Sequence, residues 1–414
     1  MASFFDTIFY ILIFLSVYAQ VFFFVTFLEN RKKIVIREKE IKLKSYPSVT
    51  IVVPCWNEEK TVRKTVLSLL KLNYPKDKLQ IFLINDGSTD NTKEVVNEFL
   101  NYSNIKVFHK ENGGKFTALN LGLEKSDTEF FGCLDADSFV HKEALIRIMS
   151  YFENDPTAMA VAPAVVVNES KNFVQSAQRA EYNMGLFFKK MLGFLGAINV
   201  TPGPLTIFRK KVFNDLGPYR HGHNTEDMEI AYRMQKNNYK IEHCNDAFVY
   251  TNTPGTLGKL YRQRLRWIYG FINNTIDYRA VLFRKKYGNF GLFTLPMGVI
   301  SIFAVSFLFG RIVYNVFNFV HIKILEFNTV GLNISINKPN FDPFFINTEA
   351  SLFLMIMVYS LIIFALLFGR KMAKEKRILS WDTVLFFPVF GLMAPFWFLR
   401  ALFNTIISRK PSWR

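Results

Sequence analysis

The stretch Phe130-Phe131-Gly132-Cys133-Leu134-Asp135-Ala136-Asp137 joins a short apolar run directly to two carboxylates that are separated by one residue. An uncharged run rich in aromatic residues is typical of a buried strand, and the acidic pair follows where that strand would end. Mg²⁺ and Mn²⁺ prefer oxygen ligands and usually share them with phosphate groups. The pattern therefore predicts a metal site at Asp135 and Asp137, against the alternative of a solvated acidic loop.

Around this stretch, short β-prone runs alternate with amphipathic stretches from residue 48 to about residue 167. The strand-like runs are Val49–Val53, Leu79–Ile84, Ile105–Phe108 and Glu129–Leu134, and the helical stretches are Glu58–Leu72, Thr92–Tyr102 and Phe116–Glu124. Alternation at this spacing predicts βαβ units and a Rossmann-like, mostly parallel sheet. Ligands bind such sheets beyond the carboxyl ends of the strands. Glu58, Asp86 and the acidic pair all follow predicted strand ends.

Two motifs in this region suit a nucleotide. Asp86 lies in Asn85-Asp86-Gly87-Ser88, where a strand-end carboxylate can accept hydrogen bonds from a base or ribose and Gly87 permits close backbone approach. Gly113-Gly114-Lys115 precedes a predicted helix, so Lys115 could meet a phosphate at that helix N-terminus. Each motif alone is ordinary turn chemistry. Their order along one α/β region is what favours a nucleotide site.

Thr225-Glu226-Asp227 opens a predicted helix over Asp227–Met234, with Thr225 or Asn224 as its N-cap. Asp227 is the candidate general base, the group that would take a proton from an attacking hydroxyl. A helix N-terminus lowers the pKa of a carboxyl group, so burial must raise it if Asp227 is to act as a base. The alternative is an acidic first turn that only stabilises the helix.

Gln263-Arg264-Leu265-Arg266-Trp267 is predicted to be helical, which brings Gln263, Arg266 and Trp267 to one side. A guanidinium can clamp a diphosphate through two hydrogen bonds, and an indole offers a flat face on which a sugar ring can stack. Interfacial Arg and Trp are also common membrane anchors. The neighbouring Arg262 and Arg264 are expected to face lipid headgroups.

Long apolar runs flank the α/β region of this 414-residue chain, half of which is hydrophobic, with 45 Phe residues. Thr7–Leu28, Tyr287–Gly310 and Ser351–Gly369 each approach the ~20 residues that cross a bilayer as a helix. Buried core helices are the alternative. Thr383–Leu399 is shorter and contains two prolines, so a full crossing and a re-entrant path both stay open.

The net charge of +17 is concentrated beside these runs, which argues against a nucleic-acid partner and for anionic lipid. The flanking basic residues are Arg31, Lys32, Lys33, Arg37, Lys39, Lys42, Lys44, Arg284, Lys285, Lys286, Arg370, Lys371, Lys374, Lys376 and Arg377. By the positive-inside rule, residues from about 30 to 286 are cytoplasmic, and Asn315–Asn347 forms a loop on the outer side.

Four parts follow from these patterns. They are a retained membrane anchor (residues 1–30), a cytoplasmic catalytic domain (31–255), an interfacial helix (256–286) and a C-terminal membrane region (287–414) with two secure spans and the proline-containing segment. The amphipathic stretches Asn172–Leu195 and Thr256–Arg284 are predicted to lie on the membrane surface beneath the catalytic domain. For the first, an ordinary core-facing helix is the alternative.

In this order the motifs resemble the membrane-bound family-2 glycosyltransferases, which include the poly-β-1,6-N-acetylglucosamine, cellulose, hyaluronan and chitin synthases. The resemblance covers residues 48–285 and implies an α/β GT-A catalytic domain flanked by transmembrane and interfacial helices. Together with the motifs, it implies these roles: nucleotide-sugar binding by Glu58, Asp86, Lys115, Asp135, Gln263 and Arg266, metal binding by Asp135 and Asp137, acceptor binding by Thr225 and Trp267, and catalysis by Asp227 with Glu226.

The resemblance implies a plasma-membrane, multi-pass enzyme that uses Mg²⁺ or Mn²⁺ to transfer a sugar from a UDP-sugar, favoured as UDP-N-acetylglucosamine, to a growing β-linked polysaccharide. The alternative is a non-processive enzyme that adds one sugar to a lipid-linked acceptor; a silent nucleotide-sugar-binding scaffold is a more remote one. Two positions depart from the family pattern: Asn85-Asp86 replaces a pair of aspartates, and Thr201-Pro202-Gly203-Pro204 stands where cellulose synthases carry a Cys-Gly-Ser loop. With few spans, a polymer channel would require the fourth segment, a second copy or a small membrane partner.

Overall fold

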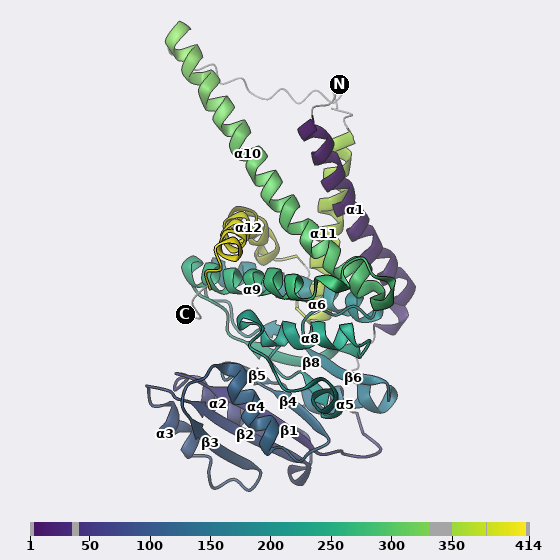
Figure 1. Cartoon of the computed structure of the whole chain (residues 1–414), viewed down its shortest axis with the longest axis vertical. Helices are drawn as coiled ribbons and strands as arrows, with labels where there is room; N and C mark the ends of the chain where they lie inside the picture. The colour runs from purple at the N-terminus through teal and green to yellow at the C-terminus, as the bar shows by residue number, and fades with distance from the viewer. Residues whose placement is uncertain (1–3, 35–40, 331–349, 378, 411–414) are drawn as a thin grey trace.

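The structure, a computed structural model, describes residues 4–34, 41–330, 350–377 and 379–410. Figure 1 shows three levels along the long axis: a sheet flanked by helices at one end, a middle level of helices that lie across the axis, and long apolar helices at the other end.

One eight-stranded sheet runs in the order β3-β2-β1-β4-β7-β6-β8-β5. Its strands are β1 (Val49–Cys55), β2 (Leu79–Asp86), β3 (Ile105–Lys110), β4 (Phe130–Cys133), β5 (Ser138–Val140), β6 (Ala158–Val167), β7 (Ile207–Arg209) and β8 (Lys240–Thr251). The four predicted strands are confirmed, and β3, β2, β1 and β4 pair in parallel. Beyond them the sheet is mixed, because β7 is antiparallel to both β4 and β6, β6 is parallel to β8, and β5 is antiparallel to β8.

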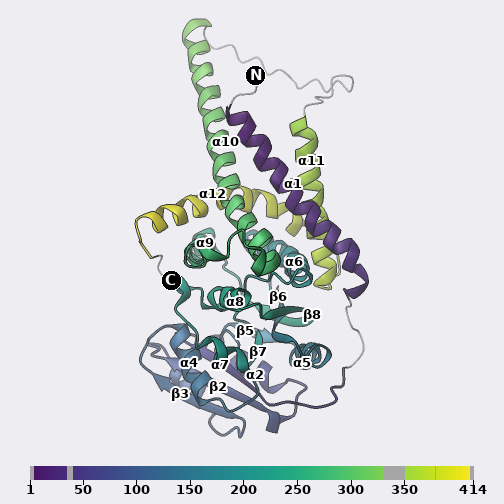
Figure 2. The ribbon, with the colours of Figure 1, turned by 45° about the vertical axis from the view of Figure 1, so that its right-hand side comes forward.

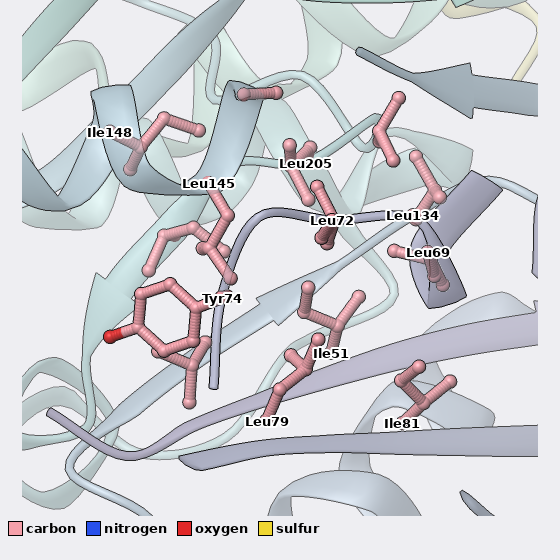
Figure 3. Packing of buried hydrophobic residues seen from close by; sticks show 14 of the residues in the cluster. Ile51, Leu69, Leu72, Tyr74, Leu79, Ile81, Leu134, Leu145, Ile148 and Leu205 are labelled. Atoms are coloured by element: carbon pink, nitrogen blue, oxygen red, sulfur yellow. The ribbon is translucent and has the colours of Figure 1, made fainter. Parts of the chain in front are cut away.

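Both faces of the parallel strands are buried, which is why these strands read as nearly continuous apolar runs. Side chains alternate between the faces. Ile51 and Ile81 belong to one core (Figure 3), whereas Val52 and Phe82 belong to the core on the opposite face. The helices of this domain are α2 (Val62–Leu70), α3 (Thr92–Asn97), α4 (Lys115–Lys125), α5 (Ala144–Asn154), α7 (Lys211–Leu216) and α8 (Glu226–Lys236).

The middle level contains α6 (Phe173–Phe194) and α9 (Leu257–Asp277). Both begin at residues whose side chains cap the helix: Asn172 accepts a hydrogen bond from the backbone N–H of Gln175 at 3.0 Å, and Thr256 accepts one from Lys259 at 3.3 Å. The helical prediction for both stretches is confirmed. The helices lie between the sheet and the long apolar helices in both views (Figures 1 and 2).

Four helices in the described part of the chain are long and apolar enough to cross a membrane. They are α1 (Phe4–Asn30), α10 (Leu295–Val330), α11 (Ala350–Met372) and α12 (Trp381–Ile406). In Figure 2, α1, α10 and α11 extend away from the sheet, whereas α12 runs across the molecule over α6 and α9.

Two sequence expectations for the membrane part are wrong. Residues 315–330 are helical and continue α10, because no glycine or proline interrupts them and apolar residues recur throughout; the rest of the expected outer loop, from residue 331, lies outside the described residues. Arg370 does not face lipid headgroups. It is buried, pairs with Asp382 of α12 at 3.2 Å, and donates to the carbonyl oxygen of Arg377, so it closes the α11–α12 turn.

Candidate active site

Three predicted residues meet beyond the end of β4. Nζ of Lys115, the first residue of α4, lies 2.6 Å from Oδ1 of Asp135 and 3.0 Å from Oε1 of Glu226, the first residue of α8. Burial disfavours the charged form of Lys115, but the charges of Asp135 and Glu226 outweigh it and raise the pKa well above its ordinary value. Lys115 is therefore a fixed cation that joins the strand-end side of the site to α8.

Asp137 lies in a negatively charged environment on the same edge. Burial raises its pKa to about 7, and the charges of Asp135 and Glu58 act in the same direction. A bound cation would relieve the repulsion between the carboxylates of Asp135 and Asp137. No group of three or more His, Cys, Asp or Glu residues that could hold a metal occurs in the described ranges. Two carboxylates nevertheless fit Mg²⁺ or Mn²⁺, which take their remaining ligands from water and substrate phosphates.

Asp227 follows Glu226 in the first turn of α8. Burial and the charge of Glu226 raise its pKa to about 6, in the direction that a general base requires. The pKa of Glu226 moves the other way: although burial would raise it, the charge of Lys115 lowers it. Two adjacent carboxyl groups thus differ in proton affinity, and Asp227 is the one suited to accept a proton near neutral pH.

The loop Thr201-Pro202-Gly203-Pro204 connects the two sides of the site. The backbone N–H and the hydroxyl of Thr201 donate to the carbonyl oxygen of Asp227 at 3.2 and 2.8 Å. At the other end, Sγ of Cys133 donates to the carbonyl oxygen of Gly203. A Cβ atom at Gly203 would lie 2.7 Å from Nζ of Lys115 and 2.8 Å from Oδ1 of Asp135, so a side chain here would displace the ends of these two groups.

Asp86 is buried at the end of β2, and both oxygens of its carboxylate accept hydrogen bonds from neighbouring parts of the chain. Oδ1 accepts hydrogen bonds from Nζ of Lys110 and from the backbone N–H of Gly113 at 3.1 Å, and Oδ2 accepts one from Gly114 at 3.0 Å. The predicted nucleotide residue therefore holds the loop that leads into Lys115. Any direct contact with a base or ribose must share this carboxylate.

Glu58 follows β1, as predicted, and lines a surface pocket of about 390 Å³ with Asn57, Glu59 and Asp90. Its carboxylate accepts a hydrogen bond from the hydroxyl of Thr61 at 2.7 Å. Since its charge acts on Asp137, Glu58 borders the acidic edge of the site.

The chain enters α8 through an unusual turn. Gly222, His223 and Asn224 all have positive φ angles, a conformation that costs energy for the two residues that carry a Cβ. Thr225 occupies the predicted N-cap position, but its hydroxyl donates to the carbonyl oxygen of Gly222 at 2.7 Å and does not cap the helix. The same hydroxyl accepts a hydrogen bond from Nδ2 of Asn274 at 2.9 Å.

Helix α9 contacts and stabilises the turn at residues 222–224. Asn274 also donates to the carbonyl oxygen of Gly222 at 3.1 Å, and a Cβ atom at Gly270 would lie 2.3 Å from Oγ1 of Thr225. Thr225 is only 3% exposed. Its predicted contact with an acceptor does not fit this geometry, because the residue is buried and its hydroxyl proton is already donated to Gly222. Gly270 and Asn274 were not found by sequence reasoning, since no motif marks a glycine that permits close packing.

Gln263, Arg266 and Trp267 lie on α9, as predicted, and the positive charge of Arg266 acts on both Glu226 and Asp227. The expectation that Arg264 faces lipid headgroups is wrong. Arg264 is 4% exposed, forms an ion pair with Glu181 of α6, and places its guanidinium carbon 4.1 Å from the ring centroid of Trp267. Arg262 is exposed.

Lys189 of α6 is a further residue that the sequence did not indicate. Burial lowers its pKa, while the charges of Asp227 and Glu181 oppose the shift, so its ammonium group lies within electrostatic reach of both carboxylates. The sequence alone does not show which face of an amphipathic helix a lysine such as Lys189 occupies.

The chain is similar to several known proteins. Residues 50–217 match the model of "Glycosyl transferase family 2". The chain is 27% identical over 361 residues to the poly-beta-1,6-N-acetyl-D-glucosamine synthase of Staphylococcus epidermidis, covering 86% of this chain and 84% of the relative. It is 29% identical over 273 residues to the synthase of the same name from Staphylococcus aureus, 65% of each chain.

Among solved structures, the mannosyltransferase of Pyrobaculum calidifontis in complex with GDP-Man and Mn²⁺ superposes with a TM-score of 0.56 at 15% identity, over 96% of this chain and 99% of that one. The fold is that of a GT-A-like glycosyltransferase, with an eight-stranded sheet and helices on its faces. In the described residues, four helices long and apolar enough to cross a membrane accompany it. Residues 50–217 thus match a glycosyl transferase family 2 domain, and most of the chain is similar to poly-β-1,6-N-acetylglucosamine synthases.

Proposed function

We propose that the protein is a membrane-embedded, inverting glycosyltransferase that moves N-acetylglucosamine from its UDP-sugar to a growing β-linked polysaccharide. The observation that carries this proposal is the arrangement around Lys115, which brings Asp135, Glu226 and Asp227 to one edge beside α9. The donor and the polymeric product are inferred from the staphylococcal relatives.

Asp135 and Asp137 would hold Mg²⁺ or Mn²⁺, which would neutralise charge on the departing diphosphate. Lys115 and Arg266 would bind the diphosphate from the other side, with Gln263 beside them. Asp86 would act on the nucleotide through the loop 111–114 that it holds, and Glu58 would border the nucleotide pocket.

In the transfer step, the acceptor hydroxyl oxygen attacks the anomeric carbon from the face opposite the diphosphate. The bond from that carbon to the diphosphate oxygen breaks, UDP leaves with the electron pair, and the hydroxyl proton passes to the carboxylate of Asp227. A carboxyl group whose pKa is about 6 is ionised at neutral pH and still basic enough to assist this transfer. Glu226 would keep Lys115 in place, and Thr225 would position the turn that leads into α8.

The proposed organisation follows the same reasoning. Residues 1–30 form an anchor, 31–255 a cytoplasmic GT-A domain, 256–286 an interfacial helix, and 287–414 a membrane region in a plasma-membrane protein. As the polymer grows it would leave through the membrane part, with α12, a second copy or a small membrane protein completing the path.

The test is release of UDP by the purified protein in nanodiscs with Mg²⁺ or Mn²⁺, over a panel of UDP-sugars, with the product sized and Asp227→Asn as the control. A long polymer from UDP-N-acetylglucosamine that the variant cannot make supports the proposal. Addition of a single sugar to a lipid would establish the non-processive alternative instead. No release with any sugar nucleotide would overturn the proposal.

A further inference from the structure

Arg264 lies where three helices meet on the acceptor side of the site. It belongs to α9, its ion-pair partner Glu181 belongs to α6, and its guanidinium carbon is 5.9 Å from the ring centroid of Phe390 on α12. Tyr182, the neighbour of Glu181, lies 6.0 Å from the same carbon. A buried arginine between aromatic rings requires a specific partner, because an unpaired buried charge is strongly unfavourable.

The guanidinium has few polar partners. Nη2 donates to Oε2 of Glu181, whereas Nε and Nη1 have no hydrogen-bond partner among the described residues. Its orientation therefore depends on the ion pair with Glu181, on a side-chain hydrogen bond with Tyr182 and on contacts with ring faces, of which Trp267 at 4.1 Å is the nearest. A planar group held over the indole also restricts the rotation of the indole.

The cluster adjoins the reactive groups. The charge of Asp137 acts on Tyr182, and Glu181 and Asp227 both act on Lys189, which places Glu181 close to the site. A stacking platform selects a sugar only when its face is held in one orientation before the ligand arrives. The contacts around Arg264 provide such support for Trp267.

We propose that Glu181 and Arg264 are positioning residues that fix the indole of Trp267 for binding of the acceptor sugar. The assignment deepens the proposed function, since it rests on Trp267 as the sugar platform. It gives the second residue of the QxxRW motif a role different from the lipid contact that the sequence suggested, and it makes α12 part of the support through Phe390.

The experiment measures the KM for short β-linked N-acetylglucosamine oligosaccharides at saturating donor, and the KM for donor separately, with the full chain in nanodiscs. Glu181→Gln keeps the shape of the side chain and removes its charge, and Arg264→Lys keeps the charge and removes the planar group. We expect the acceptor KM to rise about three- to tenfold in each, with the donor KM and the slow transfer of sugar to water unchanged. Glu98→Gln, which breaks an exposed ion pair with Arg63, is the matched control and should change neither constant.

A double-mutant cycle decides whether the effect passes through the indole. In a Trp267→Ala background, Glu181→Gln should raise the acceptor KM no further. An unchanged acceptor KM in both single variants, a full additional increase in the Trp267→Ala background, or a parallel rise of the donor KM would each overturn the proposal. If Arg264→Lys does not fold, Glu181→Gln decides alone. Failure of the proposed function would appear in the unaltered protein, as an absence of sugar transfer, and is thereby distinguished from failure here.

Discussion

The two sides of the candidate site are built differently. On the strand side, Asp86 ends β2 and Asp135 comes two residues after β4, and because both strands pair in parallel with β1 these positions lie at the same edge of the sheet. On the helix side, Glu226, Asp227 and Trp267 depend on contacts between segments far apart in the chain, such as Asn274 with Gly222 and Arg264 with Glu181. The strand side is thus set by local sequence and sheet geometry, and the helix side by tertiary packing against α6, α9 and α12.

The difference predicts where substitutions act. Changes at Asp227 and at the contacts that support it and Trp267 should affect the reaction and the acceptor, whereas changes at Asp86 on the strand side should affect the donor. The following experiments test that division.

The largest effect is expected for Asp227→Asn, which keeps the shape of the side chain but cannot accept the proton. Transfer should fall by about 10²–10⁴-fold, with the affinity for donor retained. Single-turnover transfer and equilibrium binding of UDP, measured on the same preparation, check this. Asp227 is not the base if the variant transfers sugar at more than about a tenth of the normal rate.

Gly270→Ala should disturb the helix side without touching a reactive group. The added Cβ would lie 2.3 Å from Oγ1 of Thr225, so the turn before α8 must shift, which we expect to cost about 1–3 kcal/mol of stability and to lower kcat about tenfold. Thermal unfolding and kcat are the measurements.

Gly258→Ala on the same helix is the matched control, because nothing lies within 4 Å of its added Cβ. This variant should be neutral or more stable, by up to about 1 kcal/mol. Equal behaviour of the two alanine variants would show that the close approach of α9 to Thr225 is unimportant.

The pH dependence should report Asp227. Its pKa is raised to about 6 and the reaction needs the ionised form, so activity should be nearly full at pH 7 and fall about tenfold by pH 5. The logarithm of kcat/KM at limiting acceptor, plotted from pH 5 to 8, gives the apparent pKa. A profile without a limb between pH 5 and 7 would contradict Asp227 as the titrating base.

The smallest effect is expected on the strand side, for Asp86→Asn. The carboxylate of Asp86 accepts hydrogen bonds from the N–H groups of Gly113 and Gly114. An asparagine side chain keeps one accepting oxygen, but its NH₂ group cannot accept the second hydrogen bond, so the loop 111–114 is held less firmly. We expect the donor KM to rise about fivefold and the acceptor KM to stay unchanged. A change in the acceptor KM alone would remove the distinction between the two sides.

Sequence reasoning succeeded where chemistry follows a local pattern. The strands β1 to β4, the strand-end positions of the acidic residues and the opposing influences on Asp227 all follow from short stretches and simple electrostatics. The antiparallel insertion of β7 could not be predicted in this way, because its pairing with β4 joins segments about 75 residues apart, a separation that no periodicity encodes.

The errors share one cause. Arg264 was assigned to lipid headgroups as an arginine of an interfacial helix, and Arg370 as one of the basic residues that flank the apolar runs. Each instead pairs with an acidic residue of another helix, Arg264 with the partly exposed Glu181 and Arg370 with the buried Asp382. Gly270 and Lys189 were missed for the same reason: their importance depends on which residue lies opposite.

The course of α12 bears on how many times the chain passes through the bilayer. α12 runs across the other apolar helices, and the charge of Lys410, beyond its end, acts on His221 in the turn before α8. An odd number of crossings, by α1, α10 and α11, would then leave residues 4 and 410 on opposite faces of the membrane. The measurement uses a reporter protein that fluoresces only when it folds in the cytoplasm. Fused after residue 414 it should fluoresce, whereas fused before residue 1 it should be exported unfolded and should not fluoresce.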